Sequence, residues 1–340
     1  MNRTLKAVIV AAALIVVGAV LAGCGLWGMD GAWDALTGTS KLVTTQETVT
    51  GEFTDIHIDI SWVDLELLSS PDGTCYYKTA TYDNMYCSYR VENGTLIIRQ
   101  DDNRKWHQHI GIYWEKTYLQ VYLPEDVYGQ LTIQSDTSDV TIPADFTFEN
   151  VTITTDTGDL TVACQVTQQL SMTSTTGDMT VRGIASQSVT AAATTGDVYM
   201  QDITCNDLSV STTTGFCRIL RADVAKSLSA SSTTGDKYLA DVQCGTLKLE
   251  ATTGDGELRN VVVSGDARLE SDTGDWELEG FDAANITITT DTGDVEGTLR
   301  SDKIFFVITD TGDVEVPRTT SGGRCEITTD TGDIEIEIAP

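Results

Sequence analysis

The chain repeats a variant of Thr-Gly-Asp eleven times between residues 136 and 333. Successive copies lie 19 or 20 residues apart, and the central residue is Gly in every copy but the first, which has Ser138. A period kept this regularly is typical of one supersecondary unit that is stacked on itself. The sequence therefore predicts a repeat architecture in which most of the chain is scaffold.

Apolar residues alternate on both sides of each motif. Counted from the central residue, they occupy positions −7, −5, +2 and +4, as Val151, Ile153, Leu160 and Val162 do in the second copy. A spacing of two residues is the period of a β-strand, so each repeat is predicted to hold short strands that meet at a Thr-Gly-Asp corner. Gly suits such a corner because it adopts a positive φ without the steric cost of a β-carbon.

The apolar strand faces have to be buried between repeats, because one repeat is too small to bury them alone. Coils stacked about 4.8 Å apart would hide these faces and pair their backbones, giving a rod roughly 50 Å long. Residues 56–67 resemble one further, degenerate coil. The predicted fold is all-β: a parallel β-solenoid, or β-helix, of about 11–12 coils with 19–20 residues in each coil. Gly256, at an inward position, predicts a local narrowing of the rod.

The N-terminal segment, residues 1–29, has the features of a membrane helix. Residues 7–29 carry no charge and are long enough to span a bilayer. Arg3 and Lys6 precede them and predict a cytoplasmic N-terminus with an exported remainder. The run Leu-Ala-Gly-Cys that ends at Cys24 resembles a bacterial lipoprotein box, in which Cys24 would be lipidated. Both interpretations stay open, and both place the body of the chain outside the cell at the bacterial membrane.

Three further regions follow this segment. Residues 30–50 are polar and rich in Gly and Thr, which predicts a tether. Residues 51–130 hold nine of the eleven tyrosines and are predicted to form an N-terminal β cap that includes the degenerate coil. Residues 131–340 hold the solenoid repeats. At their end, Glu335 and Glu337 alternate with isoleucines, which predicts a charged edge strand that protects the end of the sheet.

The aromatic residues of the cap form the one candidate recognition patch. Tyr76, Tyr77, Trp106 and Trp114 are the residues that we select for a ligand patch, because aromatic side chains stack on sugars and anchor protein partners. The alternative is that they pack the cap. The Glu92–Thr95 stretch reads Glu-Asn-Gly-Thr and predicts a hairpin turn within this region.

Acidic residues are stacked along the predicted corners. The formal net charge of −30 argues against a nucleic-acid partner. Asp occupies position +1 of every motif except one, where Phe216 interrupts the row. In the last four coils by sequence a second Asp occupies position −2, so that each reads Asp-Thr-Gly-Asp: Asp272 and Asp275, Asp291 and Asp294, Asp310 and Asp313, Asp330 and Asp333. These carboxylates suggest either a ladder that binds Ca²⁺ weakly or solvated turn caps.

The eight cysteines and the absence of catalytic motifs limit the chemistry further. Cys75 and Cys87 would be able to pair across a hairpin, whereas the cysteines of the repeats lie at positions that predict small buried side chains.

The sequence holds no nucleophile elbow, no His-Glu-x-x-His, no phosphate-binding loop and no Cys-x-x-Cys. The chain is therefore not expected to be an enzyme, and the only cofactor considered is weakly bound calcium.

The repeat motif, the Tyr-Leu-Pro run at residues 122–124 and the Cys-Glu-Ile-Thr-Thr-Asp-Thr-Gly-Asp-Ile run at residues 325–334 resemble the bacterial "putative adhesin" β-strand-repeat family, a domain of unknown function. The resemblance covers roughly residues 50–338. It implies a β-helical shape, one N-terminal membrane segment and, in some members, a link to envelope-stress responses. It supplies no catalytic residues. Ser138, Phe216 and the lipoprotein box are departures from the family pattern.

Together these features predict a non-enzymatic, membrane-anchored extracellular protein with an adhesin-like role at the cell surface. Its expected partners are the cell membrane, through residues 7–29 or a lipidated Cys24, and the cell wall, a host surface or another envelope protein. One alternative is an envelope-stress sensor or regulator that binds a peptide or lipid through the N-terminal cap. A second alternative is a solenoid that binds divalent cations.

Overall fold

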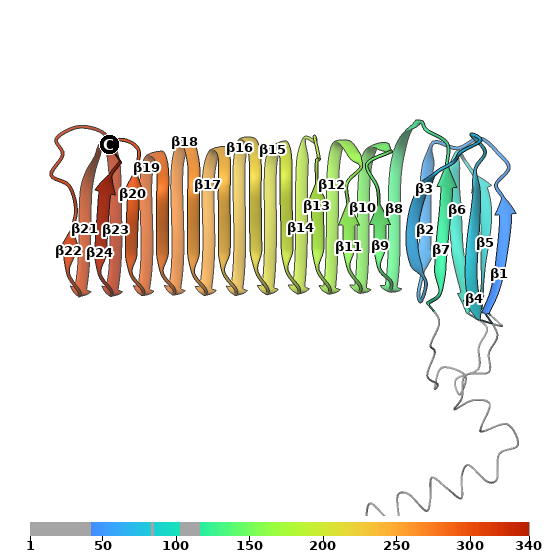
Figure 1. The fold of residues 1–340 in the computed structure, drawn as a ribbon, viewed down its shortest axis with the longest axis horizontal. Coiled ribbons are helices and arrows are strands. Elements are labelled where there is room, and N and C mark those ends of the chain that lie inside the picture. The colour runs from blue at the N-terminus through green and yellow to red at the C-terminus, as the bar shows by residue number, and fades with distance from the viewer. Residues whose placement is uncertain (1–41, 83–84, 103–115, 340) are drawn as a thin grey trace, which may run out of the picture.

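The computed structural model describes residues 42–82, 85–102 and 116–339. These residues form β-strands that stack into a long parallel β-solenoid, which confirms the predicted fold class (Figure 1). In this part of the chain no helix has the length and apolar character needed to cross a membrane. The predicted anchor at residues 1–29, with Cys24, lies outside the described residues.

The strands fall into three groups along the rod. The N-terminal end holds β1 (Leu42–Thr48), β2 (Asp55–Ile60), β3 (Asp64–Ser69), β4 (Tyr76–Tyr82), β5 (Met85–Glu92), β6 (Thr95–Asp102) and β7 (Tyr118–Leu123). The middle holds β8 (Val127–Thr137), β9 (Val140–Ile142), β10 (Thr147–Thr157), β11 (Leu160–Val162), β12 (Gln165–Thr176), β13 (Met179–Arg182), β14 (Ser188–Thr195), β15 (Val198–Thr214), β16 (Cys217–Thr234), β17 (Lys237–Thr253), β18 (Gly256–Thr273) and β19 (Trp276–Thr292). The C-terminal end holds β20 (Val295–Leu299), β21 (Lys303–Thr311), β22 (Val314–Glu315), β23 (Gly323–Thr331) and β24 (Ile334–Ile338).

Neighbouring coils pair in parallel with the register that the repeat dictates. In the middle of the rod Val198 lies opposite Cys217 and Leu208 opposite Leu228, so equivalent repeat positions stack directly. The inward positions −7, −5, +2 and +4 are fully buried in the regular coils and form one continuous core along the axis. Because the backbone of each coil pairs with coils on both sides, the core and the hydrogen bonds extend together along the stack.

The Thr-Gly-Asp corner requires Gly for two reasons. The ten corner glycines have φ between +132° and +158°, as the sequence pattern predicts. In addition, a β-carbon placed on Gly196 would lie 2.0 Å from the carbonyl oxygen of Gly177 in the preceding coil. Ser138 is tolerated at the first corner because its φ is not positive. In the stack it lies next to the turn at Ser61, whose carbonyl accepts the backbone N–H of Thr137. Close stacking of corners is therefore a second constraint that the local pattern does not reveal.

In the middle coils a second column of tight turns lies six residues after the corners. Asp202, Arg221, Asp241 and Asn260 occupy it with φ between 51° and 57°, in the left-handed region. The Arg221 guanidinium forms a two-bonded ion pair with the Asp202 carboxylate, Nε to Oδ1 at 2.6 Å and Nη2 to Oδ2 at 3.0 Å. Asn260 likewise donates to Asp241. Side-chain bonds between successive coils thus stabilise turns that only Gly would otherwise adopt at little cost.

The core compensates for its small residues by placing large ones beside them. Position +2 carries Cys217, Lys237, Gly256 and Trp276 in successive coils. A β-carbon on Gly256 would lie 2.1 Å from Cζ3 of Trp276, so the Trp ring occupies the space above the glycine. The predicted narrowing at Gly256 is therefore wrong, because the neighbouring coil fills it.

The N-terminal end of the rod combines a parallel coil with antiparallel strands. The degenerate coil, β2 and β3, pairs in parallel with β8 and β9 on one side and with β6 and β7 on the other. The β5 and β4 strands then add to β6 and β7 in antiparallel fashion, and β1 adds to β4. Asn93 and Gly94 have φ of 53° and 77°, which confirms the predicted hairpin turn between β5 and β6.

The predicted tether at residues 30–50 is wrong for its second half. Leu42–Thr48 forms β1, which pairs along its whole length with β4. Most of this strand is exposed, and it has no alternating apolar pattern. Backbone hydrogen bonds rather than side-chain burial hold it, which is why a search for apolar alternation misses it.

The C-terminal coils are not stacked in the order of the sequence. The last coil, β23 and β24, inserts between β19 and β20 on one side and β21 and β22 on the other. The prediction that Glu335 and Glu337 protect an edge strand is wrong for Glu335, which has β20 on one side and β22 on the other. Glu337 pairs with β20 alone among the described strands. The free end of the rod is the preceding coil, β21 and β22.

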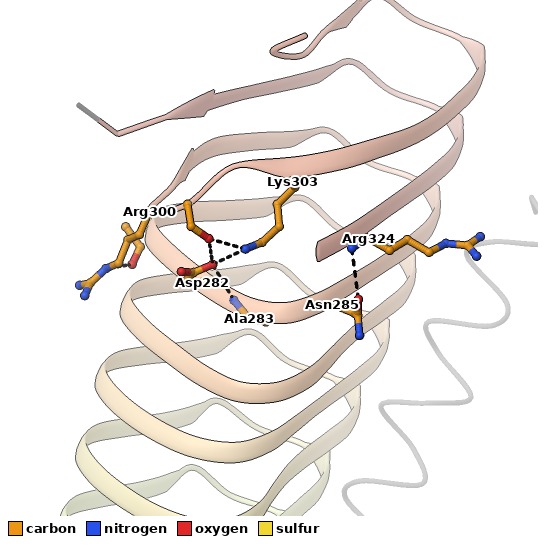
Figure 2. A network of polar contacts seen from close by, with 8 residues as sticks. Asp282, Ala283, Asn285, Arg300, Lys303 and Arg324 are labelled. Atoms are coloured by element: carbon orange, nitrogen blue, oxygen red, sulfur yellow. Dashed lines mark hydrogen bonds and ion pairs between the residues drawn. The ribbon is translucent and has the colours of Figure 1, made fainter. Parts of the chain in front are cut away.

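A buried ion pair fixes this terminal coil to the rod (Figure 2). Lys303 begins β21, and its side chain is only 4% exposed. Its Nζ donates to Asp282 Oδ1 at 2.6 Å and to Ser301 Oγ at 2.5 Å. The intervening coil presents Gly323 opposite Lys303, so the lysine passes a position without a side chain to reach Asp282 in β19.

All seven cysteines of the described residues are buried free thiols. Cys75 and Cys87 are not joined, so the disulfide that their sequence positions would allow is not present. Burial raises the pKa of both thiols to about 12. The repeat cysteines, such as Cys217 and Cys325, are core side chains as predicted.

Candidate functional site

The stacked aspartates at position +1 connect neighbouring coils through backbone amides. In the acidic C-terminal coils, Asp275 Oδ1 accepts the backbone N–H of Asp294 at 2.8 Å, and Asp294 Oδ1 accepts that of Asp333 at 2.7 Å. Asp333 Oδ1 in turn accepts the backbone N–H of Asp313 at 2.7 Å. One oxygen of each of these three carboxylates therefore accepts a corner amide of the neighbouring coil, so these aspartates act as caps between coils.

The second acidic column, at position −2, is exposed to solvent: Asp272, Asp291, Asp310 and Asp330. Within the described residues there is no group of three or more His, Cys, Asp or Glu side chains placed to hold a metal ion. The structure brings the predicted aspartates into two columns but into no coordination sphere. Calcium binding by these eight residues stays a prediction.

The predicted aromatic patch is divided by the strand geometry. Tyr76 and Tyr77 are adjacent on β4 and so point to opposite faces. Tyr77 is fully buried and donates from its hydroxyl to Glu47 Oε2 at 2.7 Å and to the Cys87 carbonyl at 3.1 Å, so it serves the packing of the cap. Trp106 and Trp114 lie outside the described residues.

Tyr76 belongs to a small cluster on the outer face of the cap. Its ring stacks on that of Tyr122 with centroids 4.4 Å apart. The Lys78 ammonium lies 4.7 Å from the Tyr122 centroid and 5.6 Å from the Tyr76 centroid. Of the two described members of the predicted patch, the half-buried Tyr76 is thus the one that a ligand of the cap would meet.

A lateral groove appears where Phe216 interrupts the aspartate column. It has a volume of about 760 Å³ and runs along the first segments of β16 to β20. Arg218 lies between two rings, its guanidinium 5.3 Å from the Phe216 centroid and 5.2 Å from the Tyr238 centroid. In the described chain Arg218 forms no ion pair, so its charge faces the groove.

The two ends of this groove differ in charge. Position +3 carries Arg218 and Tyr238 in successive coils and then changes to Glu257, Glu277 and Glu296. Arg259 stands at the junction, where it pairs with Glu257 and, at 3.3 Å, with Glu279. A cationic and aromatic half therefore meets an acidic half. The sequence pattern marks the groove only through Phe216; nothing in it singles out Arg218 or Tyr238.

The volume and lining of this groove suit a polar ligand that also has apolar surface. Small-molecule sites of this size class combine a few polar groups with aromatic walls. Sugar rings and short peptides present both kinds of surface, and aromatic side chains bind them by stacking. The groove is thus a more complete candidate binding site than the acidic columns or the cap cluster.

Comparisons with known proteins identify the family of this chain. The family model described as Toastrack DUF4097 matches residues 53–239 and residues 222–340. No curated protein matches the chain. Among solved structures, one described as a putative adhesin from Bacteroides fragilis is 14% identical, with a TM-score of 0.35 over 89% of this chain and 100% of that chain.

Two further solved structures have similar scores. A putative adhesin from Parabacteroides merdae is 12% identical, with a TM-score of 0.39 over 89% of this chain and 99% of that chain. A putative lipid binding protein from Parabacteroides distasonis is 12% identical, with a TM-score of 0.40 over 86% of this chain and 97% of that chain. The family match spans the cap and all of the coils. The chain belongs to the Toastrack DUF4097 family.

Proposed function

We propose that this chain is a non-enzymatic, adhesin-like rod that binds cell-surface glycan through the lateral groove. Residues 7–29 or a lipidated Cys24 hold it at the outer side of the bacterial membrane. The observation that carries the proposal is the coincidence of the groove with Phe216, the one corner out of eleven that does not carry Asp at position +1. A repeat that is otherwise regular departs from its pattern where a ligand-sized depression opens.

The side chains of the groove match the chemistry of a sugar polymer. The Phe216 and Tyr238 rings offer apolar surface on either side of the Arg218 guanidinium. Arg218 donates hydrogen bonds, and the carboxylates Asp236 and Glu257 accept them. A rigid solenoid presents this site at a fixed distance from the membrane. Several anchored copies would bind one polymer together, so weak individual sites would give firm attachment.

A substitution that follows the repeat tests this role. Phe216→Asp installs the residue that the other ten corners carry, so it should preserve the fold while removing one ring from the groove. With the full chain in lipid nanodiscs, we expect wild type to co-sediment with purified cell-wall sacculi and Phe216→Asp to bind about tenfold more weakly, a loss of about 1.4 kcal/mol. Undiminished binding by a folded Phe216→Asp variant would contradict the proposal.

The cluster around Tyr76 supports a second candidate, the envelope-stress sensor that binds a peptide or lipid through the cap. Among the described residues of the predicted patch, Tyr76 is the one that faces outward, where it stacks on Tyr122 beside Lys78. The double variant Tyr76→Ala/Tyr122→Ala separates the two functions in the same assay. If the groove is the binding site, this variant keeps its affinity for sacculi. If the cap is the binding site, the variant loses that affinity.

A further inference from the structure

The C-terminal coil lacks the burial that every regular coil has. At position +2, Val295 and Ile334 are fully buried, but Val314 of the terminal coil is 47% exposed. At positions −7 and −5, Phe305 and Val307 are only half-buried, although Cys325 and Ile327 opposite them are fully buried. The hydrophobic core is therefore open at this end of the rod, where a further coil would be needed to cover it.

The outer face of the same coil is also apolar. The β21 strand exposes Ile304, Phe306 and Ile308 by 40%, 51% and 62%. With Val314 these are four of the eight large hydrophobic side chains that are exposed in the described part of the chain. Such a concentration in a single coil marks an interaction surface rather than ordinary scatter.

The backbone of β21 offers one free edge. Among the described strands β21 pairs only with β23, and β22 only with β24. The Thr319 hydroxyl bonds the carbonyl of Lys303 at the start of the strand, which leaves the rest of that edge open. Asp313 ends the series of position +1 carboxylates, because no following coil supplies an amide to it within the described residues. The strand pairing, the hydrophobic core and the column of position +1 carboxylates therefore all end at this coil.

The opposite end of the rod is closed differently. There, antiparallel strands cover the parallel coils. Among the described strands at that end, β1 and β5 each pair on one side only, and β1 carries mostly polar side chains. The terminal coil is not frayed either, because Lys303 is fixed to Asp282 within the rod (Figure 2). A rigid, apolar and unpaired strand edge is the structure to which a further strand adds.

Charge decides which partner fits. Asp302 and Asp310 flank the apolar stretch of β21, and Asp313 and Glu315 follow it, all exposed. Two copies of this chain would bring these acids together on rods that each carry a net charge of −30. A basic segment would instead meet complementary charges at both ends of the strand.

We propose that the C-terminal coil binds an extended basic segment of a partner protein, which adds to β21 as a further β-strand. Alternate apolar side chains of that segment cover Val314, Phe305 and Val307, and lysines or arginines pair with the flanking aspartates. This surface lies on the terminal coil and is separate from the lateral groove.

A designed peptide tests the proposal. The probe is fluorescent Lys-Val-Lys-Val-Thr-Val-Lys-Val-Lys, titrated with the full chain in nanodiscs and followed by fluorescence anisotropy. We expect saturable binding that weakens as salt rises. The same peptide with its central Thr replaced by Pro, which interrupts strand pairing, and one with Glu in place of Lys should each bind at least tenfold more weakly. No binding of the first peptide, or equal binding of all three, overturns the proposal.

Matched substitutions locate the site. Ile308→Lys adds a positive charge to the edge and should weaken peptide binding at least tenfold. Val127→Lys should leave peptide binding unchanged, because Val127 is similarly exposed, at 63%, but lies on β8.

Amide hydrogen exchange of wild type provides a readout without a variant. The peptide should slow exchange in residues 304–311, and unchanged exchange there refutes the site. A concentration-dependent dimer that Ile308→Lys abolishes and the peptide does not displace would identify a second copy as the occupant and overturn the proposal.

Discussion

Lys237 is a cation at a position where most coils place an apolar side chain. It occupies position +2, is 1% exposed, and lies between Cys217 and Gly256 of the neighbouring coils. These two small residues leave room for its long side chain, and its Nζ donates to Ser232 Oγ at 2.5 Å. Burial lowers the pKa of Lys237 from its ordinary 10.5 to about 8, because the charged form loses its hydration.

The depressed pKa predicts a stability change that depends on pH. The unfolded chain holds the Lys237 proton up to pH 10.5 and the folded chain up to about pH 8. Charged Lys237 therefore destabilises the fold below pH 8, and this cost disappears as the pH rises from 8 to 10.5. We expect Lys237→Met to raise the free energy of unfolding by about 3 kcal/mol at pH 7, with the gain vanishing near pH 10.5.

Chemical denaturation of wild type and variant across this pH range measures the difference directly. Comparing the two proteins cancels the titration of the buried thiols that lie away from Lys237. The Cys217 thiol does not cancel, because burial raises its pKa and the charge of Lys237 lowers it. Lys226→Met is the matched control, because Lys226 is exposed and its replacement should give no pH-dependent difference. A gain for Lys237→Met that is equal at pH 7 and pH 10.5 would show that the buried amine does not change its charge in this range.

The sequence predicts which residues face the core. It does not explain why a particular residue type, such as lysine, stands at one of these positions. The alternation at −7, −5, +2 and +4 correctly places Val151 and Leu160 inside. The same register places Lys237 inside, against the usual preference of lysine for solvent. Its room depends on Cys217 and Gly256 in other coils, and such contacts between distant residues are not visible in a local pattern.

At the level of the corner, stacking predicts unequal costs for two glycine substitutions. Gly196→Ala combines a positive φ of 145° with a β-carbon 2.0 Å from the Gly177 carbonyl oxygen. We expect it to lower the free energy of unfolding by about 4 kcal/mol, because backbone strain and overpacking each cost about 1–3 kcal/mol. Gly183→Ala is the matched control. Its φ is 67°, but nothing lies within 4 Å of the added carbon, so the loss should be only about 1 kcal/mol.

Denaturation curves of the two variants, monitored by circular dichroism, measure this contrast. Both substitutions add one methyl group to a turn in the same half of the rod, so composition and helix propensity do not separate them. Equal losses would mean that neither the φ of 145° nor the contact with Gly177 adds to the cost at Gly196. In that case the close approach of the corners would not constrain the sequence.

The order of the elements is the part of the fold that the sequence does not determine. All coils share one apolar pattern, so any coil is able to stack on any other. The insertion of β23 and β24 before β21 and β22 depends on the connection at residues 316–322, which carries the chain back past the terminal coil. The repeat thus predicts the unit and its period but not which unit ends the rod. The same reason hides the lateral groove, since Arg218 and Tyr238 become neighbours only after stacking.

For the whole molecule, a net charge of −30 makes the response to cations a test of how the acidic columns act. The position +1 carboxylates accept backbone amides, whereas exposed Asp291 and Asp310 at position −2 stand beside them without a bond in the described chain. If the two columns bind calcium, Ca²⁺ at about 1 mM, the range of weak extracellular sites, should raise the melting temperature by about 2 °C or more beyond NaCl of equal ionic strength.

The double variant Asp291→Asn/Asp310→Asn should remove most of this calcium-specific shift. It takes away two candidate ligands but leaves every position +1 acceptor in place. Asp223→Asn, at an exposed site away from the corners, should leave the shift unchanged. If NaCl and CaCl₂ shift the melting temperature equally, both salts act by screening the repulsion along the rod. The aspartates would then be turn caps alone, and adhesion would depend on the groove and the terminal coil, without cation bridges.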